Sequence, residues 1–197
     1  SYDFCFCGCK YSKQASIIKI PNHSLLGGDA FYKQAAAMKW KERDSLAVSE
    51  ILRGNIPAFL KKFVRINTQI TTHDGKVVKA FYYVMPDYLS IGTNDDFARI
   101  PLTPMAAQQI ADSFHCFLPT RKIVNDIYDQ AKVKLEPVPM YAFRDSSVTM
   151  WHHTLIVEGQ RKGRKGLISG IKKDVVISER ISQDAKLNRV AIYDSIN

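Results

Sequence analysis

One cysteine and two histidines are the side chains whose types and spacing could support catalysis. Cys116 lies in the segment HCFLP (115–119), directly before a predicted helix. The positive end of a helix dipole lowers the pKa of a nearby thiol and favours the nucleophilic thiolate. His152 and His153 follow in a predicted strand, where they point to opposite faces, so either of them could reach the thiol as a base.

A third polar group would have to orient that base. Asp174 is the candidate, and it completes a Cys-His-Asp arrangement for nucleophilic catalysis. The arrangement predicts a hydrolase that acts on a peptide or cell-wall substrate. Its chain order, a cysteine on a helix and then a histidine on a strand, is similar to cell-wall peptidases of the NlpC/P60 type, although their Asp-Cys-Ser-Gly-like motif is absent. The alternative is a small cysteine that packs between two helices.

The four cysteines are unevenly placed. Cys5, Cys7 and Cys9 occupy alternate positions near the start, and Cys116 stands alone. Structural zinc usually binds Cys-x2-4-Cys pairs, so this spacing argues against a metal site. Zinc shared by Cys116 and the two histidines is disfavoured because adjacent strand residues diverge. We therefore predict no metal and no cofactor. Free thiols and disulfides stay open, and disulfides would indicate an oxidising compartment.

The chain is basic, with 28 Lys and Arg against 19 Asp and Glu and a formal net charge of +9. Such a charge favours anionic partners, which are nucleic acid, acidic polysaccharide or a membrane face. The clearest basic feature is the loop QRKGRKG (160–166), which could bind phosphate or uronate groups or be only a solvated tip. Its residues and two later lysines form the predicted anion-binding patch: Arg161, Lys162, Arg164, Lys165, Lys172 and Lys173. Single-stranded nucleic acid would want aromatics among these charges, and residues 159–197 offer only Tyr193.

Capping and turn signals locate the expected elements. Thr103 is a good N-cap with Pro104 after it, Gly54 suits the position after a helix, and Asp74-Gly75 predicts a two-residue hairpin turn. The turn 93–96, with paired carboxylates ahead of Arg99, suits calcium, a sugar-binding edge or an ordinary polar turn. The expected helices span residues 30–40, 44–53, 104–114 and 119–131, with a short one near 57–63. The expected strands span residues 65–72, 76–85, 88–92, 149–158, 167–178 and 189–193.

These elements predict a single α+β domain over residues 29–197. Its antiparallel sheet, centred on a meander of residues 65–92, carries N-terminal helices and a two-helix insertion whose first helix points Met105 and Ile110 into the core. Residues 1–28 form a separate cysteine-containing N-terminal segment. No apolar run approaches the ~20 residues of a membrane span. The start at Ser1, without Met or an apolar leader, indicates a processed chain. Whether Asn197 is the natural terminus stays open.

Three segments carry a family resemblance: GNIPAFL (54–60), IPLTPMAAQQIAD with the later CFLPT (100–120), and KKDVVIS (172–178). They resemble a family of bacterial, export-type proteins with no established activity. The resemblance spans most of residues 30–193 and implies a shared α+β fold and a secreted or extracytoplasmic location. In that family the chain continues past the strand that ends at Tyr193 into a tail with its own histidine.

Two functions of different classes follow. The first is a non-catalytic extracellular binding or assembly domain that engages an anionic polymer, a polysaccharide or nucleic acid, or copies of itself through its basic C-terminal face. The second is the Cys-His hydrolase with Cys116 as nucleophile.

Overall fold

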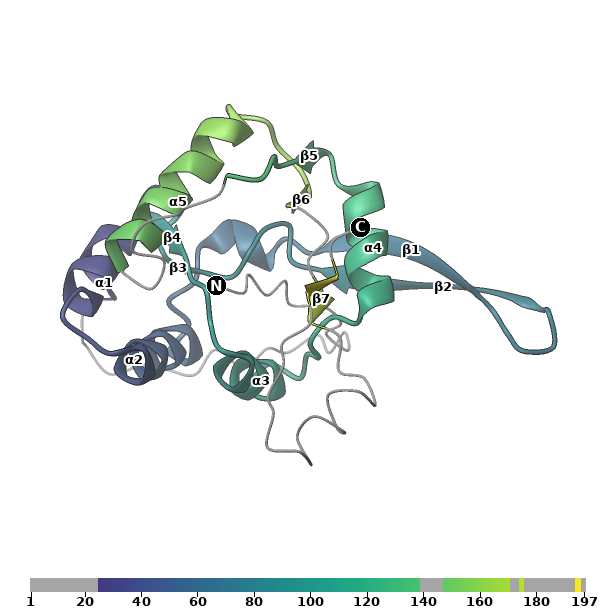
Figure 1. The fold of residues 1–197 in the computed structure, drawn as a ribbon, viewed down its shortest axis with the longest axis horizontal. Coiled ribbons are helices and arrows are strands. Elements are labelled where there is room, and N and C mark those ends of the chain that lie inside the picture. Colours follow the sequence, from purple (N-terminus) through teal and green to yellow (C-terminus); the bar gives the residue numbers. More distant parts are fainter. Residues whose placement is uncertain (1–24, 139–146, 171–173, 176–193, 196–197) are drawn as a thin grey trace.

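Short helices and two-stranded sheets make up the part of the chain that the structure describes, and its class is α+β. The computed structural model describes residues 25–138, 147–170, 174–175 and 194–195 (Figure 1). The helices are α1 (Gly28–Ala35), α2 (Trp40–Leu52), α3 (Pro104–Ser113), α4 (Arg121–Gln130) and α5 (Ser147–Arg161), with a 3-10 helix η1 (Ala58–Lys61). The strands are β1 (Val64–Thr71), β2 (Val77–Val84), β3 (Ser90–Gly92), β4 (Phe97–Arg99), β5 (Val133–Lys134), β6 (Ile168–Ser169), β7 (Asp174–Val175) and β8 (Asp194–Ser195).

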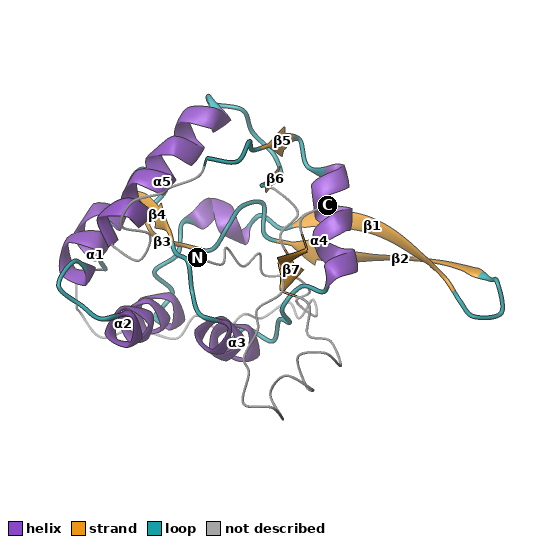
Figure 2. Cartoon of the chain, viewed as in Figure 1, coloured by secondary structure: helices purple, strands orange, loops and turns teal. Residues whose placement is uncertain are grey.

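Strands β1 and β2 form an antiparallel ribbon that projects from the body of the molecule (Figure 2). The predicted hairpin is confirmed, but its loop has three residues instead of two. The Thr72 N–H donates to the Lys76 carbonyl at 2.8 Å, and the Gly75 N–H donates back to the Thr72 carbonyl at 2.9 Å. Gly75 has φ +80°, as the last position of a three-residue hairpin loop requires.

The expected central meander is wrong. β3 pairs with β4, and β1–β2 is a sheet of its own. Between β2 and β3 the chain turns through Met85, Asp87 and Leu89, which are all buried, so β3 leaves the ribbon and enters the body. The β5–β6 pair is parallel, and β7–β8 is antiparallel. The predicted strand 189–193 lies outside the described residues.

The segment 149–158 was expected as a strand and is part of helix α5. Met150, Thr154 and Val157 are buried, and their spacing of four and three residues follows one face of a helix. The β-branched and aromatic residues of this segment favour a strand locally, but packing of the buried helical face against the body overrides that preference.

Helix α3 begins as predicted, because the Thr103 hydroxyl accepts a hydrogen bond from the Ala106 N–H and Pro104 occupies the first turn. Its core face is different from the expected one. Ala106, Ala107, Ile110 and Ala111 are buried, whereas Met105 is 69% exposed. The small alanine side chains let α3 approach α2 closely, and this turns Met105 to the outside.

Most buried apolar side chains form one cluster around α1, α2, α3 and the β3–β4 pair. A smaller cluster joins the base of the ribbon to α4 and contains Ile66, Val84, Ile127 and Leu167. The remaining cluster packs Val157 of α5 on the β5–β6 pair. Figure 1 shows the same division, with α4 lying across the base of the ribbon and the other helices around β3–β4.

A buried ion-pair network crosses the main cluster. Arg99 at the end of β4 is 3% exposed, and its guanidinium donates two hydrogen bonds to Asp87, at 2.9 and 2.6 Å. A third bond, at 2.6 Å, reaches Glu158 of α5. Burial acts to lower the pKa of Arg99, but the hydrogen bonds and charges of Asp87 and Glu158 outweigh it and raise that pKa above its ordinary value. The network therefore fixes β4, the turn before β3 and α5 relative to one another.

We predict that Arg99→Met strongly destabilises the fold. The substitution removes both hydrogen bonds of Arg99 to the buried Asp87 carboxylate and leaves the Arg161 guanidinium, 3.8 Å away, as its only cation among the described residues, which costs about 3–5 kcal/mol of unfolding free energy. Urea denaturation measures this loss. Lys33→Met, which breaks the exposed pair of Lys33 with Asp29 on α1, is the control and should change the midpoint little. An equal, small shift for both variants would contradict the role of Arg99.

Candidate anion-binding surfaces

The segment that contains Cys116 is a helix C-terminal cap. Phe114 is the C-cap of α3, and the next residue, His115, has φ 53°. The Cys116 N–H donates to the Ala111 carbonyl at 2.8 Å, and the His115 N–H donates to the Asp112 carbonyl at 3.1 Å. These two bonds define a Schellman motif, in which the residue after the cap adopts the left-handed conformation. His115 is therefore placed by its backbone, and its side chain is exposed.

Cys116 is half-buried and packs against the main apolar cluster together with Phe114 and Leu118. Its sulfur is disulfide-bonded. A disulfide sulfur is not a thiolate, and the thiolate is the nucleophilic form of cysteine. The Cys-His hydrolase stays a prediction, and it applies only to a chain in which Cys116 is reduced.

The two candidate bases lie on helix α5 and not on a strand. His152 is exposed and His153 is half-buried, because successive helix residues point about 100° apart. Neither forms a hydrogen bond or ion pair with Cys116 in the described part of the chain. Asp174 lies in β7, and its side chain is outside the described set. The Cys-His-Asp arrangement therefore stays a prediction.

The turn 93–96 is held by its own hydrogen bonds. The Thr93 hydroxyl accepts from the Asp95 and Asp96 N–H groups, and the Asn94 side chain accepts from the Phe59 N–H at 3.2 Å. Asp96 accepts from the Asp29 N–H at the start of α1. These bonds are those of an ordinary polar turn. Among the described residues, no three His, Cys, Asp or Glu side chains gather closely enough to hold a metal ion.

The predicted basic loop forms the end of α5, and its two arginines are used internally. The Arg164 guanidinium donates to the carbonyls of Gln160 at 2.8 Å and Arg161 at 3.2 Å, the last carbonyls of the helix. Arg161 donates to the Arg164 carbonyl at 2.9 Å, and its guanidinium lies 3.6 Å from Glu158. Cations that bond terminal helix carbonyls stabilise the helix end.

The two lysines of this loop lack the internal contacts of its arginines in the part of the chain that the structure describes. Lys162 and Lys165 are exposed and take part in no ion pair within the described residues. Lys162 has a left-handed backbone conformation at the end of α5, with φ 49°. Two of the four predicted charges of the loop are thus available to an anion, and Lys172 and Lys173 lie outside the described residues.

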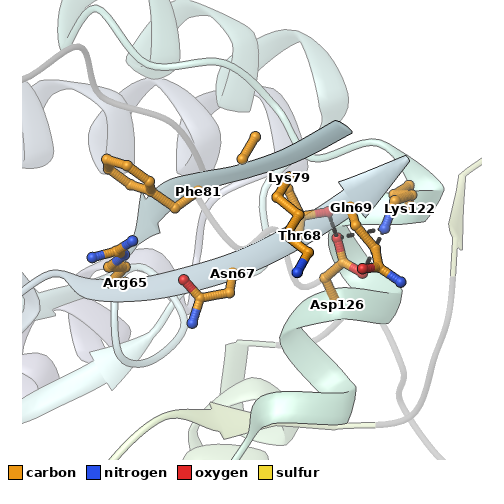
Figure 3. A pocket seen from close by; sticks show the side chains of 9 residues that line it. Arg65, Asn67, Thr68, Gln69, Lys79, Phe81, Lys122 and Asp126 are labelled. Carbon is orange, nitrogen blue, oxygen red and sulfur yellow. Dashed lines mark hydrogen bonds and ion pairs between the residues drawn. The ribbon is translucent and has the colours of Figure 1, made fainter. Parts of the chain in front are cut away.

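A second basic surface lies on the β1–β2 ribbon. In the observed register Asn67 pairs with Phe81 and Gln69 with Lys79, so Arg65, Asn67 and Gln69 share one face with these two β2 residues. They line a shallow groove of about 540 Å³ together with Lys122 and Asp126 of α4 (Figure 3). Sites for small ligands have volumes of roughly 300–1,000 Å³.

Polar bonds hold α4 against the ribbon at this groove. The Gln130 side chain donates to the Asn67 carbonyl at 2.9 Å and accepts from the Asn67 N–H at 3.1 Å, so it covers the open edge of β1 as a strand would. Asp126 accepts from the Thr68 hydroxyl at 2.6 Å and from Lys122 at 2.8 and 2.9 Å. Burial acts to raise the pKa of Asp126, but the hydrogen bonds from Lys122 and Thr68 outweigh it and lower that pKa.

The sequence pattern indicates only the β1 half of the ribbon surface. A two-residue Asp74-Gly75 loop would pair Gln69 with Ala80, whereas the observed three-residue loop pairs Gln69 with Lys79. This shift of one residue brings Lys79 and Phe81 to the face of Arg65, Asn67 and Gln69. Ile66, Thr68 and Ile70 occupy one face of the first strand, and Arg65, Asn67 and Gln69 on the opposite face carry the polar groups. The groove itself could not be predicted from the sequence, because it needs contact between two distant segments. The Thr68–Asp126 hydrogen bond, which joins β1 to α4, links residues 58 positions apart.

Comparisons with protein-family models, with curated proteins and with solved structures found no match for this chain. None of the described helices is both long enough and apolar enough to cross a bilayer.

Replacing His115 tests the backbone role of the cap. His115→Gly should stabilise the protein by about 0.5–1 kcal/mol, because glycine adopts a positive φ without the steric cost of a Cβ. His115→Val should destabilise it, since a β-branched residue is strained there. Thermal unfolding of both variants under oxidising conditions measures the difference. A decrease in stability for His115→Gly would mean that the imidazole itself contributes to the fold.

Asp126→Asn tests the contact between α4 and the ribbon. The lowered native pKa of Asp126 means that its ionisation stabilises the fold above the ordinary value of 3.8, and that this contribution is lost as the pH falls through the native pKa. At pH 7 we expect a loss of about 0.5–1 kcal/mol, because Lys122 is solvent-exposed. The difference from the wild type should shrink as the pH falls below 3.8. Asp112→Asn on α3 is the control, and a pH-independent difference for Asp126→Asn would contradict the ion pair.

Proposed function

We propose that this chain is a non-catalytic binding domain that acts outside the cytoplasm and engages an anionic polymer through exposed lysines. The observation that carries the proposal is the way the structure divides its charges. Asp44, Glu50 and Asp87 are buried, at 7%, 4% and 2% exposure, and only Arg99 is a fully buried cation among the described residues. Among the described residues, burial thus removes three carboxylates and one guanidinium from the surface, which supports contact with an anionic partner.

Each buried carboxylate has an internal partner. Asp44 accepts hydrogen bonds from the hydroxyl and N–H of Thr103 at the start of α3. Glu50 accepts from the Asn55 side chain at 2.6 Å, directly after the C-terminal cap of α2. These acids stabilise helix ends and are not available to neutralise surface lysines, so the surface attracts polyanions.

The loop after α5 supplies the first contact in this proposal. Its arginines cap the helix and keep the loop backbone in one conformation, while Lys162 and Lys165 extend into solvent. A point charge on a flexible stem suits the irregular spacing of charges along a polymer. The disulfide at Cys116 supports a location in an oxidising compartment, where such bonds persist.

Retention on a heparin column tests the proposal. The protein should bind at low ionic strength and elute steeply with salt, because each lysine that contacts the polymer releases counterions. Lys162→Gln with Lys165→Gln should lower the slope of log affinity against log salt by about 2, or about 1 per lysine. The matched control is Lys39→Gln with Lys41→Gln at the start of α2, which removes the same charge elsewhere.

Two results count against the proposal. A wild-type protein that does not bind heparin at about 50 mM salt excludes a polyanion-binding function, because electrostatic binding is strongest there. Equal loss of retention for the two double variants shows that net charge, and not the loop after α5, determines binding.

A further inference from the structure

The polar face of the β1–β2 ribbon, defined above by Arg65, Asn67, Gln69, Lys79 and Phe81, has no evident part in folding. The ribbon contacts the core through its other face, where Ile66 and Val84 are fully buried. All five residues of the polar face are exposed. The side chains of its four polar members form no hydrogen bond and no ion pair with any described residue. Apart from the contact of Arg65 with the Phe81 ring, these polar groups have no internal partner among the described residues and are available to a ligand.

Phe81 is the most informative member of this face. Its ring is 53% exposed, lies 4.0 Å from the Arg65 guanidinium and meets the Tyr83 ring edge-on at 5.9 Å. Full burial of such a side chain stabilises a fold by roughly 1.5–3 kcal/mol, and an exposed ring does not contribute this free energy. An exposed aromatic ring beside cations and amides is a typical binding feature.

The residue types around Phe81 match one class of polymer. Arg65 and Lys79 can neutralise phosphates, and the amides of Asn67 and Gln69 can donate to and accept from the edge of a base. The Phe81 ring offers a flat surface on which a base can stack. Lys122 and Asp126 pair with each other at the groove, so Asp126 repels phosphate little.

We propose that this groove binds single-stranded nucleic acid, with a base stacked on Phe81 and the flanking phosphates on Arg65 and Lys79. The inference rests on the proposed function, because it names the polymer class and a second contact surface. A duplex presents its stacked bases only at their edges and cannot use Phe81 in this way. A sulfated or uronate polysaccharide would gain from a dense row of cations, whereas the groove has two unpaired ones and two amides.

The experiment measures fluorescence anisotropy of a labelled single-stranded oligothymidine of 20 nucleotides, with the matching duplex and heparin as separate ligands. The wild type should bind the single strand at least tenfold more tightly than the duplex. Phe81→Ala should weaken single-strand binding by about 5- to 100-fold, in line with the loss of one stacked base. Arg65→Gln with Lys79→Gln should lower the salt slope by about 2.

Matched variants separate the groove from general effects. Phe117→Ala removes another exposed phenylalanine, 45% exposed and far along the chain after α3, and should leave single-strand binding unchanged. Lys39→Gln with Lys41→Gln controls for net charge. Phe81→Ala loses the ring contacts with Arg65 and Tyr83, so binding is measured well below its unfolding temperature, where circular dichroism shows the variant folded. Unchanged single-strand binding by the folded variant overturns the assignment of a binding role to the ring.

Failure of this inference differs from failure of the proposed function. Equal affinity for single strand and duplex, or unchanged binding by Phe81→Ala, overturns the stacking site. Heparin binding that depends on Lys162 and Lys165, without binding of the oligonucleotide, also overturns it and leaves the proposed function intact. Absence of binding to all three ligands overturns both.

Discussion

The guanidinium of Arg99 links parts of the chain that have no covalent reason to meet. It donates to Asp87, which precedes β3, and to Glu158 on α5. Arg99 and Asp87 are buried, and the Glu158 side chain is partly exposed. An ion removed from water at such a site is tolerated only when its partners surround it in good geometry. The position of α5 therefore depends on that of β4. The loop that follows α5, with its exposed lysines, is positioned by the same network, because Arg161 contacts Glu158.

The internal use of charged groups explains the character of the surface. Acidic side chains are used at the ion-pair network, at the start of α3 and at the end of α2, where each accepts hydrogen bonds from main-chain or side-chain donors. Arg161 and Arg164 serve the end of α5 in a similar way. Lysines remain outside because their flexible stems reach water easily. Among the described residues, burial thus removes more acidic than basic side chains from contact with solvent, which favours the proposed polymer binding.

The β1–β2 ribbon lies outside the ion-pair network of Arg99. Among the contacts that the structure describes, its base is joined to the body by a small apolar cluster and by Asp126 and Gln130 on α4. Its outer half is exposed on both faces, with Ile70 52% and Val78 45% exposed on the face opposite Arg65. A two-stranded ribbon in water is only marginally stable by itself, so the α4 contacts set its position. In the proposed binding mode this makes the ribbon an arm whose polar face can follow a polymer.

Signals that act over a few residues were sufficient for several parts of the fold. The cap at Thr103, the left-handed Gly54 after α2 with φ 86° and the hairpin at Asp74-Gly75 follow from the sequence, because capping and turn geometry depend on adjacent side chains and backbone. The helix at 147–161, the exposure of Met105 and the groove between α4 and β1 were decided by tertiary packing. Each depends on which distant surface a segment meets, and local propensities of a fraction of a kcal/mol per residue yield to burial of an apolar face. The sequence alone thus determined the α+β class and the excess of basic residues, and only the tertiary structure decided which charges turn inward and which remain available to a partner.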